Sequence, residues 1–348
     1  MNKHLMIALA LSASVAALTA QQPRVTDTQF NTEPAGAGLS ATVTRFQHST
    51  QQLWIGYEVP SLPRRSSSTC SDSNGSMDDG CCGEYRLEGS SNTVSTNDTA
   101  QPGKTYVLIR LEQGSVSKVR TANAGCRLNA GGVPFTWITD VKPEDSIRYL
   151  AEVAKQGSEK QPLDGALAAI AMHASPAATT TLASMTESSS PARMREKAAF
   201  WLGAERGHDG LLILKKLIHS EQDAKLREKL VFDISINHDP GATDDLIEMA
   251  KTDSDPRVRG QAIFWLAQKA GKKAASTITN AIENDPEQQV KKKAVFALTQ
   301  LPKDEGVPQL IHVADTNNNP AVRKDAIFWL GQSGDPRALA YLESVLKR

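Results

Sequence analysis

The sequence predicts a mostly α-helical protein, an α-solenoid of about six helical hairpins preceded by a small antiparallel β domain. Two registers with a period of 32 residues predict the solenoid. The first register consists of Phe200, Phe232, Phe264, Phe296 and Phe328. The second register consists of Leu150, Leu182, Leu214, Leu246, Ile278, Leu310 and Leu342. Self-similarity at such a period is typical of stacked supersecondary units rather than of one globular core.

The N-terminus indicates export. Lys3 and His4 precede an apolar run from Leu5 to Leu18, and small residues follow up to Ala20. This order is typical of a secretory signal, and the apolar run is shorter than the ~20 residues of a membrane span. We therefore expect a signal peptide at residues 1–20, cleaved after Ala20, and an exported protein that is periplasmic or extracellular.

The segment between the signal and the helices differs in composition. Residues 21–40 are polar and rich in proline and glycine, which favours a flexible leader. Residues 41–142 then show short runs of β-forming residues, which we interpret as an antiparallel β domain, a sandwich or a meander. The expected strands lie at residues 41–46, 53–59, 85–87, 106–111, 116–120 and 135–138, with Gln113-Gly114 as the turn of a hairpin.

All four cysteines lie in the expected β domain, at Cys70, Cys81, Cys82 and Cys126. In an exported chain an even number of cysteines in a loop-rich module indicates disulfides. A bond between the adjacent Cys81 and Cys82 would force a strained ring, so we expect Cys81 and Cys82 to pair outward, one with Cys70 and one with Cys126. A zinc site and a redox-active vicinal pair are the alternatives, although the usual C-x₂₋₄-C and C-x-x-C spacings are absent.

One repeat unit is clearest from Asp255 onward. Asp255-Pro256 provides a helix N-cap followed by proline at the first helical position. Apolar residues at i, i+4, i+7 and i+8 then define one face of a first helix, helix A, which ends near Gly271. A second helix, helix B, follows until Asn284-Asp285-Pro286 opens the next unit. Each unit is thus expected to be an antiparallel helix pair whose flanks are buried by stacking.

The solenoid is expected to cover residues 143–348, with helix B present seven times from about Ser146. Helix A is expected six times, and its first copy at about Leu163 to Met172 lacks both the phenylalanine and the arginine of the others. The D-P-x-V-R-x-x-A-x-x-x-L phrase at Asp255 to Leu266 resembles the HEAT-like repeats first named in phycobilisome lyases. The order Trp-Ile-Gly-Tyr-x-Val-Pro at residues 54–60, Cys-Cys at 81–82 and Cys-x-Leu-x-Ala-Gly-Gly at 126–132 resembles the front end of secreted bacterial HEAT-repeat proteins. These resemblances imply an α-solenoid whose surface binds other macromolecules.

Five of the six expected A helices carry a cation at one position, and acidic residues recur just upstream of these helices. The cationic positions are Arg195, Arg227, Arg259, Lys291 and Arg323. We interpret them as a ladder of pairs between adjacent units, with an anion-binding groove as the alternative. Lys+Arg and Asp+Glu are balanced at 39 each, so no net charge draws the protein to nucleic acid.

Tryptophan occupies one register beside the phenylalanines, at Trp201, Trp265 and Trp329. Neighbours on a helix point ~100° apart, so one aromatic of each pair is expected in the core and the other against the next unit. The alternative is an exposed stripe of aromatics for interaction.

Two function classes follow. The first is a noncatalytic protein-binding or scaffolding protein of the cell envelope, with a protein partner, no cofactor, no metal, no nucleic acid and no membrane insertion. The second is an enzyme or enzyme-accessory protein, similar to the lyase-like and hydroxylase-like relatives that the resemblance implies. The seven histidines form no i, i+4 pair in the helices, and motifs for metal, phosphate or nucleophile chemistry are absent.

Overall fold

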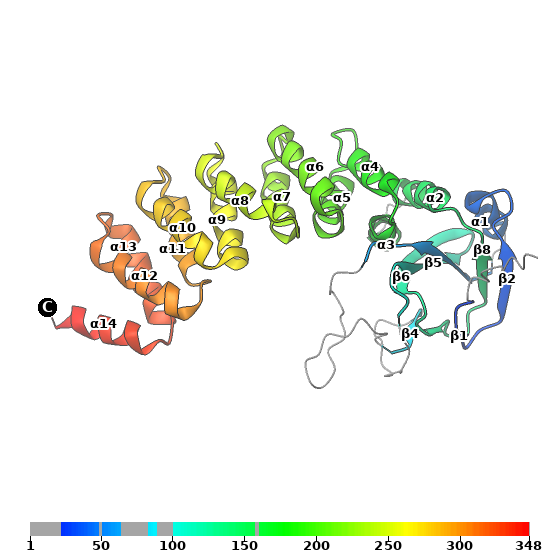
Figure 1. Cartoon of the computed structure of the whole chain (residues 1–348), viewed down its shortest axis with the longest axis horizontal. Helices are drawn as coiled ribbons and strands as arrows, with labels where there is room; N and C mark the ends of the chain where they lie inside the picture. The colour runs from blue at the N-terminus through cyan, green and yellow to red at the C-terminus, as the bar shows by residue number, and fades with distance from the viewer. Residues whose placement is uncertain (1–21, 49–50, 64–82, 89–99, 157–159, 348) are drawn as a thin grey trace, which may run out of the picture.

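The computed structural model describes residues 22–48, 51–63, 83–88, 100–156 and 160–347. A β-sheet lies at one end of the molecule, and the helices extend from it in a curved array (Figure 1). The expected solenoid is therefore confirmed. The expected signal peptide, Cys70, Cys81 and Cys82 lie outside the described residues. Cys126 is fully buried, and no described cysteine is free; the pairing of the four cysteines stays a prediction.

The main sheet has five strands in the order β2-β8-β3-β5-β6. Their bounds are Phe30–Pro34 (β2), Leu53–Pro60 (β3), Lys104–Glu112 (β5), Ser115–Asn123 (β6) and Phe135–Thr139 (β8). The pairs β3–β5 and β5–β6 are antiparallel, whereas β2–β8 and β3–β8 are parallel. The expectation of a wholly antiparallel domain is thus wrong, since the sheet is mixed. A smaller parallel sheet contains β1 (Val25–Thr26), β7 (Leu128–Asn129) and β4 (Tyr85–Arg86).

The expected flexible leader is also wrong, because residues 22–40 are part of the fold. Strand β2 pairs with β8, more than 100 residues later in the chain. The expected first strand is instead a helix, α1 (Leu39–Gln47), which buries Leu39, Thr42 and Val43. Their i, i+3, i+4 spacing is that of a helix face.

The hairpin of β5 and β6 turns where the sequence indicates. Gln113 and Gly114 both have positive φ, 50° and 77°, as a two-residue type I′ turn requires. An added Cβ at Gly114 would lie 2.6 Å from the Gln47 carbonyl oxygen. The turn therefore packs on the end of α1, and only glycine fits there.

The helices alternate as the two registers predict. The B helices are α2 (Pro143–Gln156), α4 (Pro176–Met185), α6 (Gly207–Ser220), α8 (Gly241–Thr252), α10 (Lys272–Asn284), α12 (Lys303–Thr316) and α14 (Pro336–Leu346). The A helices are α3 (Lys160–Met172), α5 (Ala192–Glu205), α7 (Ala224–Ile236), α9 (Pro256–Ala270), α11 (Gln288–Leu298) and α13 (Pro320–Gln332). The Asp255 carboxylate accepts a hydrogen bond from the Arg257 amide, so the expected N-cap is confirmed.

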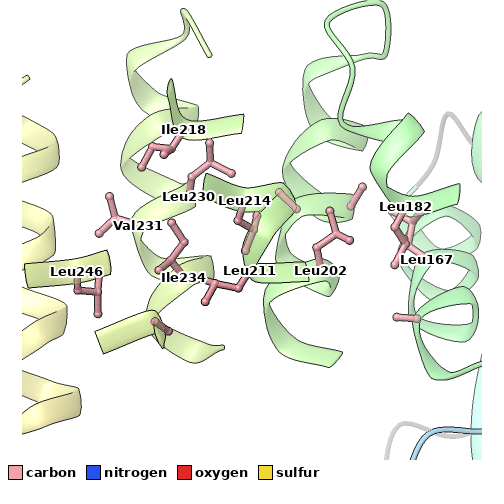
Figure 2. Close-up of a cluster of buried hydrophobic side chains, with 14 of the residues drawn as sticks. Leu167, Leu182, Leu202, Leu211, Leu214, Ile218, Leu230, Val231, Ile234 and Leu246 are labelled. Carbon is pink, nitrogen blue, oxygen red and sulfur yellow. The ribbon is translucent and has the colours of Figure 1, made fainter. Parts of the chain in front are cut away.

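One hydrophobic core runs from the sheet to the far end of the array. It contains Val43 and Ile109 of the sheet domain, Leu150 of α2 and Ala338 of α14. Figure 2 shows its middle part, where leucine, isoleucine and valine side chains of successive helices point toward one another. A second core, around Trp54 and Phe135, lies apart from it and includes Leu128 of the small sheet.

The sheet is joined closely to the first unit of the solenoid. The Ala174 amide donates to the Pro60 carbonyl at 3.0 Å, and the Leu62 amide donates to the Met172 carbonyl at 2.9 Å. A Cβ on Gly165 of α3 would lie 2.0 Å from the Val119 carbonyl oxygen of β6. The sheet therefore closes this end of the helical array, and the two parts share one core.

Candidate functional site: the aromatic face of the A helices

The cationic register forms contacts between consecutive units. Arg195 pairs with Glu221, Arg227 with Asp253, and Arg259 with Asp285, each partner 26 residues later. Each acid lies in the loop that follows the next B helix. Two of these cations also bind backbone carbonyls that precede their own helix. Arg259 Nη1 donates to Asp253 O at 2.9 Å, and Arg227 Nε donates to Ile218 O of α6 at 3.2 Å.

The last two cations keep only half of this arrangement. Lys291 donates to the carbonyls of Ile282 and Glu283, and Arg323 donates to those of Asn317 and Asn318. The position that would pair with Lys291 is Asn317, which carries no charge. These contacts are those of a ladder between adjacent units, and they occupy the groups that an anion groove would need.

The register aromatics form one connected row across five A helices. Within a helix the two neighbouring rings meet edge to face, with centroids 5.2 Å apart for Phe200–Trp201 and 4.9 Å for Phe264–Trp265. Between helices, Phe264 stacks on Phe296 at 6.0 Å and Trp265 lies 4.8 Å from Phe232. The full row is Trp201, Phe200, Phe232, Trp265, Phe264, Phe296, Trp329 and Phe328. We call it the aromatic row.

The aromatic row is neither core nor fully exposed. Trp201, Trp265 and Trp329 pack against the main core, and all of the rings except Phe328 are half-buried. Phe328 is 55% exposed. The expected packing between units is thus confirmed. The expectation that one ring of each pair lies in the core is wrong, because every ring keeps part of its surface open to solvent.

The A helices line the inner side of the array. Successive A helices are in closer contact with one another than successive B helices are, so the array bends toward the A layer. On α5, Gly203 permits this approach, since an added Cβ would lie 2.2 Å from the Asp233 carbonyl oxygen of α7. The aromatic row therefore follows a concave surface.

Asp233 interrupts the tryptophan register in the middle of the row. It is 3% exposed, and its Oδ2 has no hydrogen-bond partner among the described residues. Burial, together with the nearby Glu196 carboxylate, raises the pKa of Asp233 to about 8. The sequence analysis did not identify this site, although an acid at a register position that tryptophan holds in other units is itself a signal.

A second buried polar cluster joins the sheet to the helices. Ser146 Oγ lies 2.8 Å from Tyr57 Oη and 2.9 Å from His173 Nε2, and His173 Nδ1 lies 2.7 Å from Ala169 O. Burial lowers the pKa of His173 and raises that of Tyr57. Serine and histidine in contact suggest a nucleophile and base, but Ser146, His173 and Tyr57 are all fully buried. Their contacts hold β3, α2 and the end of α3 together.

A polar groove of about 470 Å³ lies between α6 and α8, near the loops that follow them. Two ion pairs lie within it, Lys215 with Asp245 at 2.5 Å and Arg227 with Asp253 at 2.9 Å. These pairs belong to the packing of adjacent units, so the groove offers less to a partner than the aromatic row does.

Within the described ranges, His, Cys, Asp and Glu side chains form no group of three or more that could hold a metal ion. None of the described helices has both the length and the apolar character needed to span a membrane.

The match to a protein-family model agrees with this repeat architecture. A family model described as HEAT repeats matches residues 275–348, and no curated protein matches the chain. Human deoxyhypusine hydroxylase in complex with glycerol is 17% identical over 58% of this chain and 90% of its own, with a TM-score of 0.25. The CpcE–CpcF complex of phycocyanin lyase from Nostoc sp. PCC7120 is 25% identical over 44% of this chain and 98% of its own, with a TM-score of 0.34. Kap121p is 13% identical over 59% of this chain and 27% of its own, with a TM-score of 0.38.

Proposed function

We propose that this HEAT-repeat protein is a noncatalytic scaffold of the cell envelope that binds a protein partner on its stacked A helices. The observation that carries the proposal is the aromatic row, because it places eight aromatic rings along one concave surface and leaves them partly open to solvent. Aromatic side chains supply much of the binding energy at protein interfaces.

The arrangement of charges outside the aromatic row also favours the face of the A helices as the binding surface. The register cations form ion pairs with acids or hydrogen bonds with backbone carbonyls, and two ion pairs lie within the groove between α6 and α8. Partly exposed apolar surface bordered by polar side chains is typical of interaction sites. Many modest contacts across successive units would then give the affinity.

Crosslinking in the cell tests the binding face. A photoreactive phenylalanine analogue is placed in the full chain at Gln261 of α9, beside the aromatic row, or at the exposed Glu283 of α10 on the B layer. Discrete crosslinked proteins are expected from position 261 and not from position 283. Equal crosslinking at the two positions, or crosslinking from position 283 alone, would contradict the proposal.

Export is tested separately. The tagged full chain is expected in the envelope or secreted fraction of the source cell, with a mature N-terminus at Gln21. A chain that keeps Met1 and stays with the cytoplasmic proteins would remove the envelope from the proposal and leave the binding face to the crosslinking result.

A further inference from the structure

The charges beside the aromatic row differ between the two ends of the solenoid. The relevant positions lie one helical turn before each phenylalanine, three and four residues earlier, and so neighbour it on the helix surface. In α5 these positions are Glu196 and Lys197, and in α7 they are Glu228 and Lys229. Each of these helices therefore carries one charge of each sign beside its phenylalanine.

These opposite charges pair with neighbouring helices. Lys229 Nζ lies 2.5 Å from Glu196, Arg257 lies 3.7 Å from Glu228, and Lys197 lies 3.8 Å from Asp164. The N-terminal part of the row is therefore bordered by charges that compensate one another.

In the C-terminal part the compensation is lost. The equivalent positions are Lys292 and Lys293 in α11, and Lys324 and Asp325 in α13. None of the ion pairs found among the described residues involves Lys292, Lys293 or Lys324. Lys292 and Lys324 are exposed, and Asp325 is the one acid at these four positions.

Lys293 lies on the same surface, where a glycine of α9 leaves space for its side chain. Gly260 occupies the position of Glu228 and Lys292, and an ideal Cβ there would lie 2.5 Å from Lys293 Cδ and 3.4 Å from Lys293 Nζ. The side chain of Lys293 thus lies across Gly260, with its ammonium group between α9 and α11. Gly260 lies one helical turn before Phe264, and Lys293 lies one turn before Phe296, so this cation belongs to the part of the surface that carries these two stacked rings.

The apolar surface is also most open at this end. Phe328 is 55% exposed and Ile327 is 38% exposed, both on α13. Cations that form no ion pair with the described residues therefore border Phe296 and Phe328, and Phe328 is the most exposed ring of the row. Complementary charge and apolar contact together would fit a ligand that carries both carboxylates and apolar groups.

We propose that the C-terminal part of the aromatic row, over α9, α11 and α13, binds an extended acidic polypeptide segment with apolar side chains. This inference rests on the proposed function and names the chemistry of its partner. Packed helices are about 8–10 Å apart, a distance that about three residues of extended chain span. Such a segment can cross the three helices with an apolar side chain at each phenylalanine and carboxylates at Lys292, Lys293 and Lys324. Nucleic acid fits less well, because the whole chain has no net positive charge.

The test uses the full chain and four labelled probes of matched length. Three are peptides of alternating residues, one acidic and apolar (Glu/Leu), one basic and apolar (Lys/Leu), and one acidic and polar (Glu/Ser); the fourth is a single-stranded oligonucleotide. Binding is followed by fluorescence anisotropy from about 50 mM to about 500 mM salt, across which charge contacts weaken. The Glu/Leu peptide is expected to bind at least about tenfold more tightly than the other probes, and less tightly as salt rises.

Two triple variants locate the site. Lys292→Glu with Lys293→Glu and Lys324→Glu is expected to weaken Glu/Leu binding at least about tenfold. The matched control, Lys216→Glu with Lys251→Glu and Lys273→Glu, changes the same charge at exposed positions of the B helices and is expected to change it less than about twofold. Circular dichroism checks that both variants remain folded.

The inference is overturned if the Lys/Leu peptide or the oligonucleotide binds as tightly as the Glu/Leu peptide, or if the two triple variants behave alike. It is also overturned if the face instead joins two copies of this chain, seen as a dimer in sedimentation that Phe328→Ala abolishes. Crosslinking at position 261 that continues in any of these cases would show that the protein-binding function stands and that only the partner's chemistry is wrong.

Discussion

Arg259 and Asp285 form a buried bidentate ion pair that joins two consecutive loops of the solenoid. Arg259 Nε lies 2.8 Å from one carboxylate oxygen and Nη2 lies 2.9 Å from the other, and the two side chains are 9% and 5% exposed. Burial opposes the charge on Asp285, but the hydrogen bonds from Arg259 and the Glu287 amide, together with the positive charges of Arg259 and Lys291, outweigh it and lower the pKa of the carboxyl group. Because Arg259 also binds the loop before its own helix, one side chain fixes the spacing of two units.

Arg259→Ala should lower the free energy of unfolding by about 3 kcal/mol, since it leaves the buried Asp285 carboxylate without its partner. Urea denaturation followed by circular dichroism measures the change. The control is Arg257→Ala, two residues earlier. The Arg257 side chain is 48% exposed, so its loss should lower the free energy of unfolding much less than the loss of Arg259. Equal losses for the two variants would contradict a structural role of the buried pair.

Gly203 and Gly331 hold the same register position, but their replacement by alanine should change the stability of the protein in opposite directions. Gly203→Ala places a Cβ 2.2 Å from the Asp233 carbonyl oxygen, so it should separate α5 from α7 and cost about 2 kcal/mol. Gly331, four units later, has nothing within 4 Å of an added Cβ, so Gly331→Ala should stabilise its helix by about 0.5–1 kcal/mol. Thermal unfolding of the two variants measures both signs, and destabilisation by both would argue against close packing as the reason for Gly203.

Asp233→Asn should stabilise the protein, and more so at higher pH. The pKa of Asp233 is about 8 in the folded protein against about 3.9 in an unfolded chain, so the folded state binds the proton more strongly. Its contribution to stability is therefore present below about pH 4 and is lost as the pH rises toward 8.

The amide that replaces the Asp233 carboxyl group cannot ionise, so the gain of this variant over the parent should grow from near zero at about pH 4 to about 2–5 kcal/mol at about pH 8. Melting temperatures across that range measure the difference. Asp244→Asn, at an exposed position in the first turn of α8, is the control and should keep the parent's pH dependence. A constant gain for Asp233→Asn at every pH would show that the acid is ionised in the folded protein.

Ser146→Ala should loosen the sheet and the first helices together. The change leaves Tyr57 Oη and His173 Nε2 without the hydroxyl that both contact, at a cost of about 1–3 kcal/mol. Hydrogen exchange should report faster opening in β3, α2 and α3, while Ser188→Ala, exposed in the loop before α5, should leave exchange unchanged. Faster exchange confined to α2 would show that the cluster does not couple the sheet to the solenoid.

The periodic part of the fold could be predicted from the sequence because its contacts repeat. Apolar registers mark both helices of each unit, so the seven B helices and six A helices described between residues 143 and 347 were expected in their order. The hairpin at Gln113-Gly114 was equally local, since the two turn residues carry the required φ angles themselves.

The sheet domain could not be predicted to the same extent, since its decisive contacts are not local. Strand β2 was interpreted as part of a leader because Pro34 and nearby glycines suggest a loop, yet Phe30 pairs with Phe135. Helix α1 was missed because the alternation at Ala41 and Val43 was weighed above the helical spacing of Leu39, Thr42 and Val43. The contact of Gly165 with the Val119 carbonyl has no signal in either segment alone.

The sequence predicted which residues form the aromatic row but not how far they are exposed. Its members were identified by register, but their half-buried state depends on how far each unit is rotated on the next, which the spacing does not give. The burial of Asp233 follows from the same stacking. The loss of mixed charges beside Phe296 was visible in the sequence, since Lys292 and Lys293 replace the opposite charges of the earlier units.

The sheet shares its core with α2 and α3. Helices therefore cannot be removed at this end of the array without opening that core. A gene that gained or lost a 32-residue unit between α7 and α13 would keep every contact of that junction, whereas deletion of α3 would uncover β6 and its neighbours. Variation in repeat number among descendants of this protein is therefore expected in the interior of the array, at a distance from the sheet.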